Sequence, residues 1–237
     1  MKKNVLKAGI ATLVMLLFSL GVTAQDGNKN VITQTRNVAT FDGLSVSGIF
    51  KVIYTQGEPQ SVKIETDENL MEQVVTEVHG GKLEIGTKGS IHNSSKMIAY
   101  VTSKSLNFLG MSGATKFNAT NKIETQKLKI ELSGVANATF TANVTDVICN
   151  LSGTAKLDLE GTGEQLSADL SGTAKLMAAK YEIKDAKVDA SGVGTATINA
   201  TKTVALNASG VSKITYTPHD NLDIKKIEVS GMAHINK

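Results

Sequence analysis

The sequence predicts an all-β fold, a parallel β-helix (β-solenoid) built from coils of about 20 residues. Three observations favour it. A Ser-Gly pair recurs at nearly even spacing, apolar and polar residues alternate around each pair, and the chain has 21 glycines, two prolines and no tryptophan. This composition suits many tightly stacked short strands.

The Ser-Gly pair marks one coil of the repeat. From Ser112 onward, successive serines are separated by 21, 19, 19, 20, 18 and 21 residues. A repeat this short cannot bury an apolar face alone, so we expect successive copies to stack on one another. The serines of these pairs are Ser47, Ser112, Ser133, Ser152, Ser171, Ser191, Ser209 and Ser230.

Residues alternate in character on both sides of each pair, as the copy around Ser171 illustrates. Ala168 and Leu170 are apolar and Asp169 between them is polar, and after the glycine the inward positions continue with small and then larger apolar residues. A period of two is typical of a strand with one buried face. Because stacked strands lie about 4.8 Å apart, each aligned column becomes a row along the rod.

The glycine of each pair has the parity of the inward residues. We therefore expect either that two walls approach closely at Gly172 and its equivalents or that the strand bends there. Either arrangement leaves no room for a side chain.

Residues 1–24 are predicted to be an export signal. Lys2, Lys3 and Lys7 precede an apolar centre over residues 8–20, and small residues end at Ala24. The alternative is an uncleaved anchor, but the apolar stretch is short for the roughly 20 residues that a bilayer requires. We expect no membrane span once the signal is removed.

The remaining chain is predicted to hold a polar leader over 25–37 and one domain over 38–237. Residues 38–104 form an irregular N-terminal part, in which a short helix over 67–75, with Asp67 as its N-cap, covers the end of the solenoid. Residues 105–237 form the regular coils.

Charge and cysteine content narrow the class of protein. The chain has 25 basic and 22 acidic residues, and the signal holds three of the basic ones, which leaves 22 of each. A neutral mature chain gives no reason to expect nucleic acid as a partner. The single cysteine, Cys149, occupies an inward position and is predicted to be a buried free thiol.

The chain resembles the exported bacterial proteins with a head GIN domain, which are described as autotransporter adhesins. The resemblance covers about 38–237 and rests on residues 41–48 with Lys51 and Val52, on 62–65 followed by Asn69 and Leu70, on 82–85 and on the later Leu-Ser-Gly coils. It implies that 38–237 is a GIN-type domain, a right-handed parallel β-helix. It also implies a place in the cell envelope: periplasmic, associated with the outer membrane or at the cell surface.

A polar column lies two residues before the serines. Two carboxylates on adjacent coils could hold Ca²⁺ or act as an acid and a base on a sugar. Alternatively, the column is a solvated outer face. It consists of Glu131, Asn150, Asp169, Asp189, Asn207 and Glu228.

A lysine column lies four residues after the serines. It could bind an anionic polysaccharide, or it could simply keep strand edges from associating. It consists of Lys116, Lys156, Lys175 and Lys213. The four histidines are scattered without metal-ligand spacing, so we expect no metal and no cofactor.

Our first functional hypothesis is therefore a non-enzymatic, adhesin-like envelope protein. It would present polar rows and variable loops to a polysaccharide or to an envelope or cell-surface protein. A carbohydrate-active β-helix enzyme and a periplasmic structural or stress-response module are the alternatives. The oligomeric state is left open.

Overall fold

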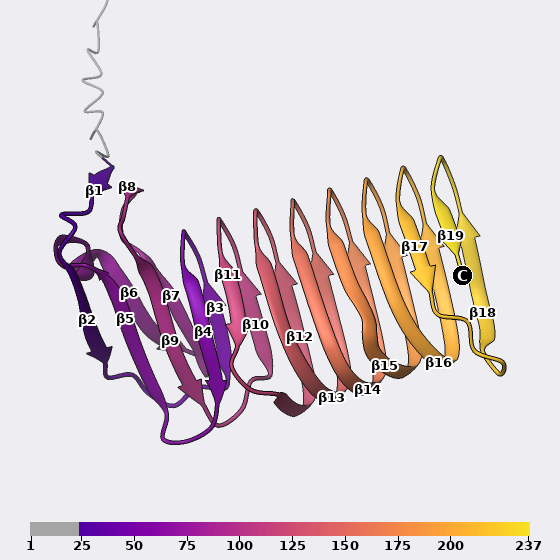
Figure 1. Ribbon diagram of the computed structural model, residues 1–237, viewed down its shortest axis with the longest axis horizontal. Coiled ribbons are helices and arrows are strands. Elements are labelled where there is room, and N and C mark those ends of the chain that lie inside the picture. The colour runs from indigo at the N-terminus through magenta and orange to yellow at the C-terminus, as the bar shows by residue number, and fades with distance from the viewer. Residues whose placement is uncertain (1–23) are drawn as a thin grey trace, which may run out of the picture.

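A computed structural model describes residues 24–237 (Figure 1). The predicted export signal, except for Ala24, lies outside the described residues. The described chain forms a β-solenoid in which parallel strands of successive coils stack along one axis. The predicted fold class is confirmed.

Each regular coil has two walls that meet at a sharp Ser-Gly turn. In what we call the entry wall the chain runs toward this turn, and in the exit wall it runs away from it. The long strands start on the exit wall, round the opposite bend and finish on the entry wall of the same coil (Figure 1). The regular strands are β10 (Phe108–Met111), β11 (Lys116–Ala119), β12 (Ile123–Leu132), β13 (Asn137–Leu151), β14 (Lys156–Leu170), β15 (Lys175–Ala190), β16 (Thr195–Ala208), β17 (Lys213–Tyr216), β18 (Asp223–Val229) and β19 (His234–Asn236).

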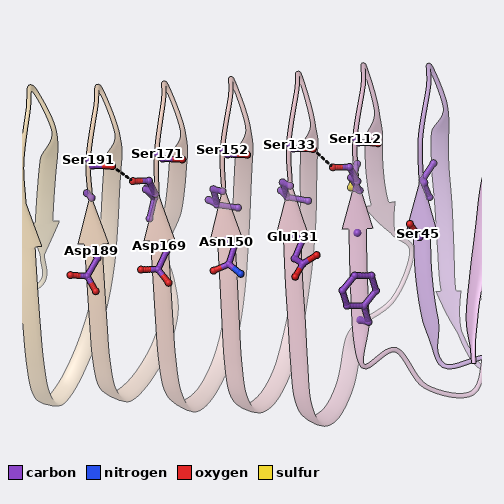
Figure 2. Close-up of a pocket in the computed structure, with 18 of the residues that line it drawn as sticks. Ser45, Ser112, Glu131, Ser133, Asn150, Ser152, Asp169, Ser171, Asp189 and Ser191 are labelled. Atoms are coloured by element: carbon purple, nitrogen blue, oxygen red, sulfur yellow. Dashed lines mark hydrogen bonds between the residues drawn. The ribbon is translucent and has the colours of Figure 1, made fainter. Parts of the chain in front are cut away.

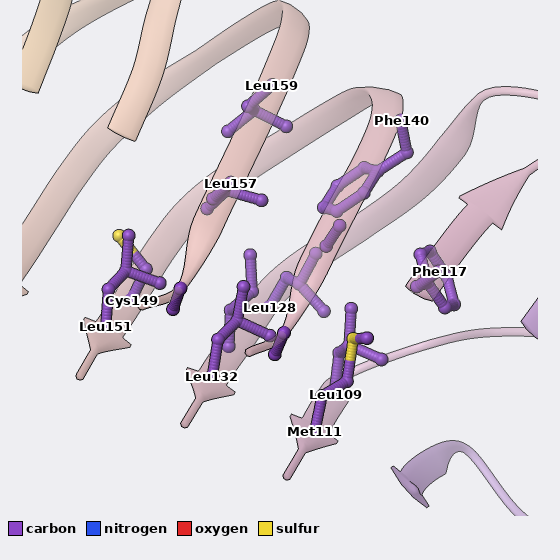
Figure 3. Packing of buried hydrophobic residues seen from close by; sticks show 14 of the residues in the cluster. Leu109, Met111, Phe117, Leu128, Leu132, Phe140, Cys149, Leu151, Leu157 and Leu159 are labelled. Carbon is purple, nitrogen blue, oxygen red and sulfur yellow. The ribbon is translucent and has the colours of Figure 1, made fainter. Parts of the chain in front are cut away.

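The core is the narrow space between the two walls. Inward residues of neighbouring coils occupy the same register, as Ile130, Cys149 and Ala168 do, and all three are buried. Figure 3 shows the leucines of successive coils forming such rows. Near the N-terminal end the ring of Phe117 packs 5.6 Å from Tyr54 and 5.8 Å from Phe140, between ring centroids.

The glycines of the Ser-Gly pairs lie at the exposed apex of each turn and not inside the core. Gly172 has a φ of +69°, and a Cβ built on it would lie 2.8 Å from the carbonyl oxygen of Gly153 on the preceding coil. Of our two expectations, the bend is correct. The left-handed backbone and the close stacking of turns together require glycine.

The N-terminal part departs from the regular repeat, as predicted. β3 (Gly43–Val46) lies between β7 (Lys82–Thr87) and β10, and β4 (Lys51–Gln56) lies between β9 (Met97–Ser103) and β11. Antiparallel strands then close both walls. β2 (Val31–Arg36) pairs with β5 (Ser61–Asp67), β5 also pairs with β9, and β6 (Val74–His79) pairs with β7.

Two strands, β1 (Gln25–Asp26) and β2, lie within the expected leader. β1 pairs with β8 (Ile91–Asn93), and β2 forms an edge of the large sheet.

The short helix of this part is a 3-10 helix over Glu68–Gln73, which buries Leu70 and Met71. Asp67 occupies the N-cap position, but its side chain makes no capping hydrogen bond. Its carboxylate instead accepts hydrogen bonds from the backbone nitrogen of Ser95 at 2.7 Å and from the Ser95 hydroxyl at 2.9 Å. Asp67 thus ties the helix to the loop before β9.

The C-terminal end of the described chain is open. β18 pairs with β16 and β19 pairs with β17. The inward residues of β18 are 41% to 50% exposed, because no coil of the described chain covers them; they are Ile224, Ile227 and Val229.

Candidate functional site

A shallow groove with a volume of about 600 Å³ lies on the outer face of the entry wall. It runs across the coils from Ser45 on β3 to Ser209 after β16. Figure 2 shows that its polar side chains form two rows that follow the axis of the rod. We call it the entry-wall groove.

The first row is the polar column anticipated from the sequence. Glu131, Asn150, Asp169, Asp189 and Asn207 are in register on successive strands and line the groove. Glu228 continues the row on β18, in register with Asn207, beyond the groove lining. At the other end Gly110 and Ser45 occupy the same register, so the row loses its side-chain charge there.

Lysines neutralise part of this acidic row. The side-chain nitrogen of Lys129 lies 2.7 Å from the carboxylate of Glu131, and that of Lys187 lies 3.3 Å from the carboxylate of Asp189. Lys226 stands 2.9 Å from Glu228 in the same way. Asp169 has no such partner within the described chain, because Ser167 takes the place of the lysine.

The second row consists of the serines of the Ser-Gly pairs. The Ser191 hydroxyl donates to the carbonyl oxygen of Leu170 at 3.1 Å, and the Ser133 hydroxyl donates to that of Met111 at 3.4 Å. Our sequence reasoning used these serines only to align the coils and did not count them as site residues. The signal was available, since they share the outward parity of the acidic row. The serines that line the groove are Ser112, Ser133, Ser152, Ser171, Ser191 and Ser209.

An aromatic residue lines the groove near its N-terminal end. The Phe108 ring lies against Gly110, so that a Cβ built on this glycine would be 2.8 Å from the ring. The side-chain nitrogen of Lys82 stands 4.1 Å from the centroid of the ring, a cation–π contact. Sequence analysis missed Phe108 because its copy lacks the polar residues seen in later coils.

The lysine column lies on the other wall. Lys116, Lys156, Lys175 and Lys213 begin the exit-wall strands and are exposed, with Lys156 and Lys175 in direct register. Asn137 separates Lys116 from Lys156, and Thr195 separates Lys175 from Lys213. These lysines do not line the groove, so the two predicted columns form separate surfaces.

Residues 24–237 offer few other groups that could bind a metal ion or react chemically. No three His, Cys, Asp or Glu side chains come together in a way that could hold a metal ion. Cys149 is a buried free thiol, as expected, and burial together with the charge of Asp169 raises the pKa of this thiol to about 12. No helix in this range is long and apolar enough to cross a bilayer.

The groove and the capped stack of parallel coils define a β-solenoid that presents rows of polar side chains. The chain belongs to the family described as "Putative auto-transporter adhesin, head GIN domain", whose model matches residues 40–219. The expected family resemblance is confirmed. A comparison with curated proteins found no match.

Solved structures share the fold. A "putative adhesin" from Bacteroides fragilis has a TM-score of 0.77 at 22% identity, with 90% of this chain and 100% of that chain covered. A "putative lipid binding protein" from Parabacteroides distasonis has a TM-score of 0.75 at 21% identity, with 91% and 99% covered. A "putative adhesin" from Parabacteroides merdae has a TM-score of 0.71 at 21% identity, with 90% and 98% covered.

Proposed function

We propose that this protein is a non-enzymatic, adhesin-like module that binds an extended glycan along the entry-wall groove. The observation that carries the proposal is the pair of polar rows. Each of the five coils from Ser133 to Ser209 contributes one serine and one carboxylate or amide to the groove. These groups recur at the coil spacing of about 4.8 Å. A polymer of repeating hydroxyl-bearing units can engage such rows at several successive points.

The chemistry of the groove suits sugars. Carboxylates and amide oxygens accept hydrogen bonds from sugar hydroxyls, while amide nitrogens and serine hydroxyls donate them. Phe108 offers a half-buried ring face at one end, where an apolar face of a sugar ring could pack. The unpaired carboxylate of Asp169 is free to accept from a ligand.

A carbohydrate-active enzyme is the second candidate, and one observation favours it. Asp169 and Asp189 are in register on adjacent strands inside the groove. Glycosidases, however, place two carboxyl groups on either side of the bond that they cleave. Both aspartates project from the same wall, so a glycan would rest on them instead of lying between them. This geometry favours holding over cleavage.

Titration of the purified protein with a panel of soluble polysaccharides, followed by calorimetry, tests the proposal. We expect saturable binding to at least one polymer, and a loss of tenfold or more in affinity for Asp169→Ala and for Phe108→Ala. Lys175→Ala on the opposite wall is the matched control and should bind normally. Absence of binding to every polymer would favour a structural module without a ligand.

The same samples distinguish the enzymatic alternative. An enzyme would shorten the polymer and release new chain ends, and Asp169→Ala and Asp189→Ala would stop this release. A binding module leaves the polymer length unchanged in wild type and variants alike. Size-exclusion chromatography of the polymer after incubation reads out the difference.

We also infer that the protein is exported to the envelope, on the basis of its N-terminal sequence and its family. Protease treatment of intact cells, with blotting for this protein and for a periplasmic control, tests where it resides. Digestion of this protein alone places it at the cell surface. Survival of both proteins places it inside the envelope and removes the basis for an adhesive role toward other cells.

A further inference from the structure

The residues that follow the Ser-Gly glycines form an exposed and mostly apolar row along the edge where the two walls meet. Figure 1 shows that these turns line up along one edge of the rod. Five of these residues are large and apolar, and they are 41% to 70% exposed. They are Ile49, Val135, Val193, Val211 and Met232. Ala114, Thr154 and Thr173 occupy the other three positions of the row, and we call the whole row the turn ridge.

The turn ridge is held rigidly by the backbone. The amide nitrogens of Val135, Val193, Val211 and Met232 each donate to the carbonyl oxygen of a Ser-Gly glycine on the preceding coil, at 2.8 Å. Turn positions exposed only to water usually carry Gly, Asn, Asp or Ser. Exposed apolar residues that gather along one edge, unlike those scattered singly, are typical of surfaces that meet a protein or a membrane.

Lysines accompany the ridge on the exit wall. Lys51 and Lys213 follow the apolar residues Ile49 and Val211 by two positions. Lys116, Lys156 and Lys175 follow the smaller ridge residues Ala114, Thr154 and Thr173 in the same way, and all five lysines lie on the same outer side. The separation along an extended strand is about 6.5 Å. Only Lys156 has a carboxylate partner within the described residues, Asp158 at 3.7 Å. The crest of this edge is therefore mostly apolar, with threonines at two positions, and one flank is positively charged.

The other flank carries no charge next to the crest. There the serine row comes first, and the carboxylates of the acidic row lie two residues further from the edge. A negatively charged surface that approaches the ridge thus meets apolar side chains, serines and lysines before it meets any carboxylate. The charge distribution selects an anionic partner.

The shape of the ridge selects among anionic partners. It is convex and one residue wide, so it offers little area to a flat protein surface and no hollow to a peptide or a glycan. A lipid surface can close around such a crest, because apolar side chains enter the boundary between headgroups and acyl chains while lysines reach the phosphates. Lysine stems extend along apolar surface to make this possible.

We propose that the turn ridge docks the rod lengthwise on an anionic lipid surface. This inference is separate from the glycan-binding proposal, since the ridge and the groove occupy different surfaces. A rod that rests on this edge leaves the entry-wall groove open to the side. The protein can then hold a polymer while attached to a membrane.

Sedimentation with vesicles tests the proposal on the purified protein. We expect the wild type to pellet with vesicles that contain phosphatidylglycerol, and to pellet far less with pure phosphatidylcholine or at high salt. The variant Val135→Ser, Val193→Ser, Val211→Ser should lose at least tenfold in partitioning. The variant Lys116→Gln, Lys175→Gln, Lys213→Gln should lose the preference for the anionic lipid.

A matched control carries Ile224→Ser, Ile227→Ser and Val229→Ser at the open end, where the apolar residues are similarly exposed. It should bind vesicles like the wild type. Circular dichroism melting confirms that each variant is folded, and Met232→Ser serves as a milder ridge variant if the triple variant is not. The proposal is overturned if the wild type stays in solution with both lipids, or if the ridge variants bind as well as the wild type. Capture of a protein partner through the ridge without vesicle binding would likewise overturn it.

Discussion

Asp169 lies directly beside Asp189, in register on the next strand, and only Asp189 has a lysine within 4 Å. Two like charges directly opposite each other on neighbouring strands destabilise a sheet. The groove therefore keeps one carboxylate whose charge is not balanced by the protein. Because this carboxylate comes at a small cost to stability, it is the residue of the proposed binding groove that we would test first.

Replacing Asp169 by Asn should leave the free energy of unfolding unchanged or raise it by about 0.2–1 kcal/mol, because it removes the repulsion from Asp189. Asp189→Asn removes the same repulsion but also the ion pair with Lys187, so its gain should be smaller. Urea unfolding at low and high salt measures both. A clear loss of stability in Asp169→Asn would mean that this carboxylate has a stabilising partner in solution.

The apex glycines should be sensitive to an added methyl group for two separable reasons. Gly80 lies outside the Ser-Gly turns, in the turn between β6 and β7, and has a φ of +57°. Nothing lies within 4 Å of a Cβ built on it, so Gly80→Ala should cost roughly 1–2 kcal/mol from backbone strain alone. Gly172→Ala adds a contact of 2.8 Å with the Gly153 carbonyl oxygen and should cost about 1–3 kcal/mol more. Chemical denaturation of the two variants tests the order. Equal losses would contradict tight stacking of the turns.

The contact between Asp67 and Ser95 should make the N-terminal part sensitive to acid. Burial acts to raise the pKa of Asp67, but the hydrogen bonds to its carboxylate outweigh burial, and the pKa lies below the ordinary value of 3.8. The folded state then binds fewer protons than the unfolded state. Stability from this group is present above pH 3.8 and is lost as the pH falls toward the folded pKa.

Asp67→Ala should lower the free energy of unfolding, since each hydrogen bond to a charged group contributes about 1.5–3 kcal/mol. Thermal melts measure the difference in Tm between the wild type and this variant. The difference should be smaller near pH 3 than at neutral pH. Glu72→Ala, an exposed change in the adjacent 3-10 helix, is the control and should behave as the wild type at both pH values. Loss of the acid sensitivity in that control would point to a different group.

Three buried groups should make the fold sensitive to base. Burial raises the pKa of Cys149 to about 12 from 9.0, and burial also raises the pKa values of Tyr54 and Tyr181 above 10.0. These groups keep their protons in the folded state at pH values where the unfolded chain releases them. The contribution of these three groups to stability should therefore be constant below about pH 9 and should fall as the pH rises further.

Cys149→Ala should move the onset of this alkaline loss toward pH 10, where the tyrosines take over. Urea unfolding between pH 8 and pH 11 measures the onset for both proteins. Identical profiles would show that the thiol is accessible to solvent and does not contribute.

The stacked coils and the orientation of most side chains could be predicted, because the spacing of the repeat gives the coil length and its alternation gives the buried face. The parity of Asp169 and Lys175 relative to Ser171 placed both residues on the outer face. The apex glycines could not be placed in the same way, since counting by twos fails at a residue with positive φ. Gly172 has the parity of the core yet lies on the surface.

The groove and the N-terminal part depended on information that a single coil does not hold. Phe108 joins the groove only because β10 stacks between β3 and β12. β7 and β9 follow β3 and β4 in the sequence but precede them in the stack, an order that comes from long-range pairing. The periodicity of the repeat predicts which coils are neighbours only where coils follow one another in sequence. It therefore does not predict the place of β7 and β9.

The open C-terminal end has a consequence for how proteins of this design change over evolutionary time. Each regular coil contacts the coils on either side of it, and the last one presents the same backbone edge and the same inward apolar positions as those before it. Duplication or deletion of one coil of about 20 residues near this end would leave the N-terminal part untouched. The length of the groove can thus be adjusted in whole coils, each of which adds or removes one serine and one acidic or amide side chain. The number of polar side chains along the groove therefore changes in steps of one coil.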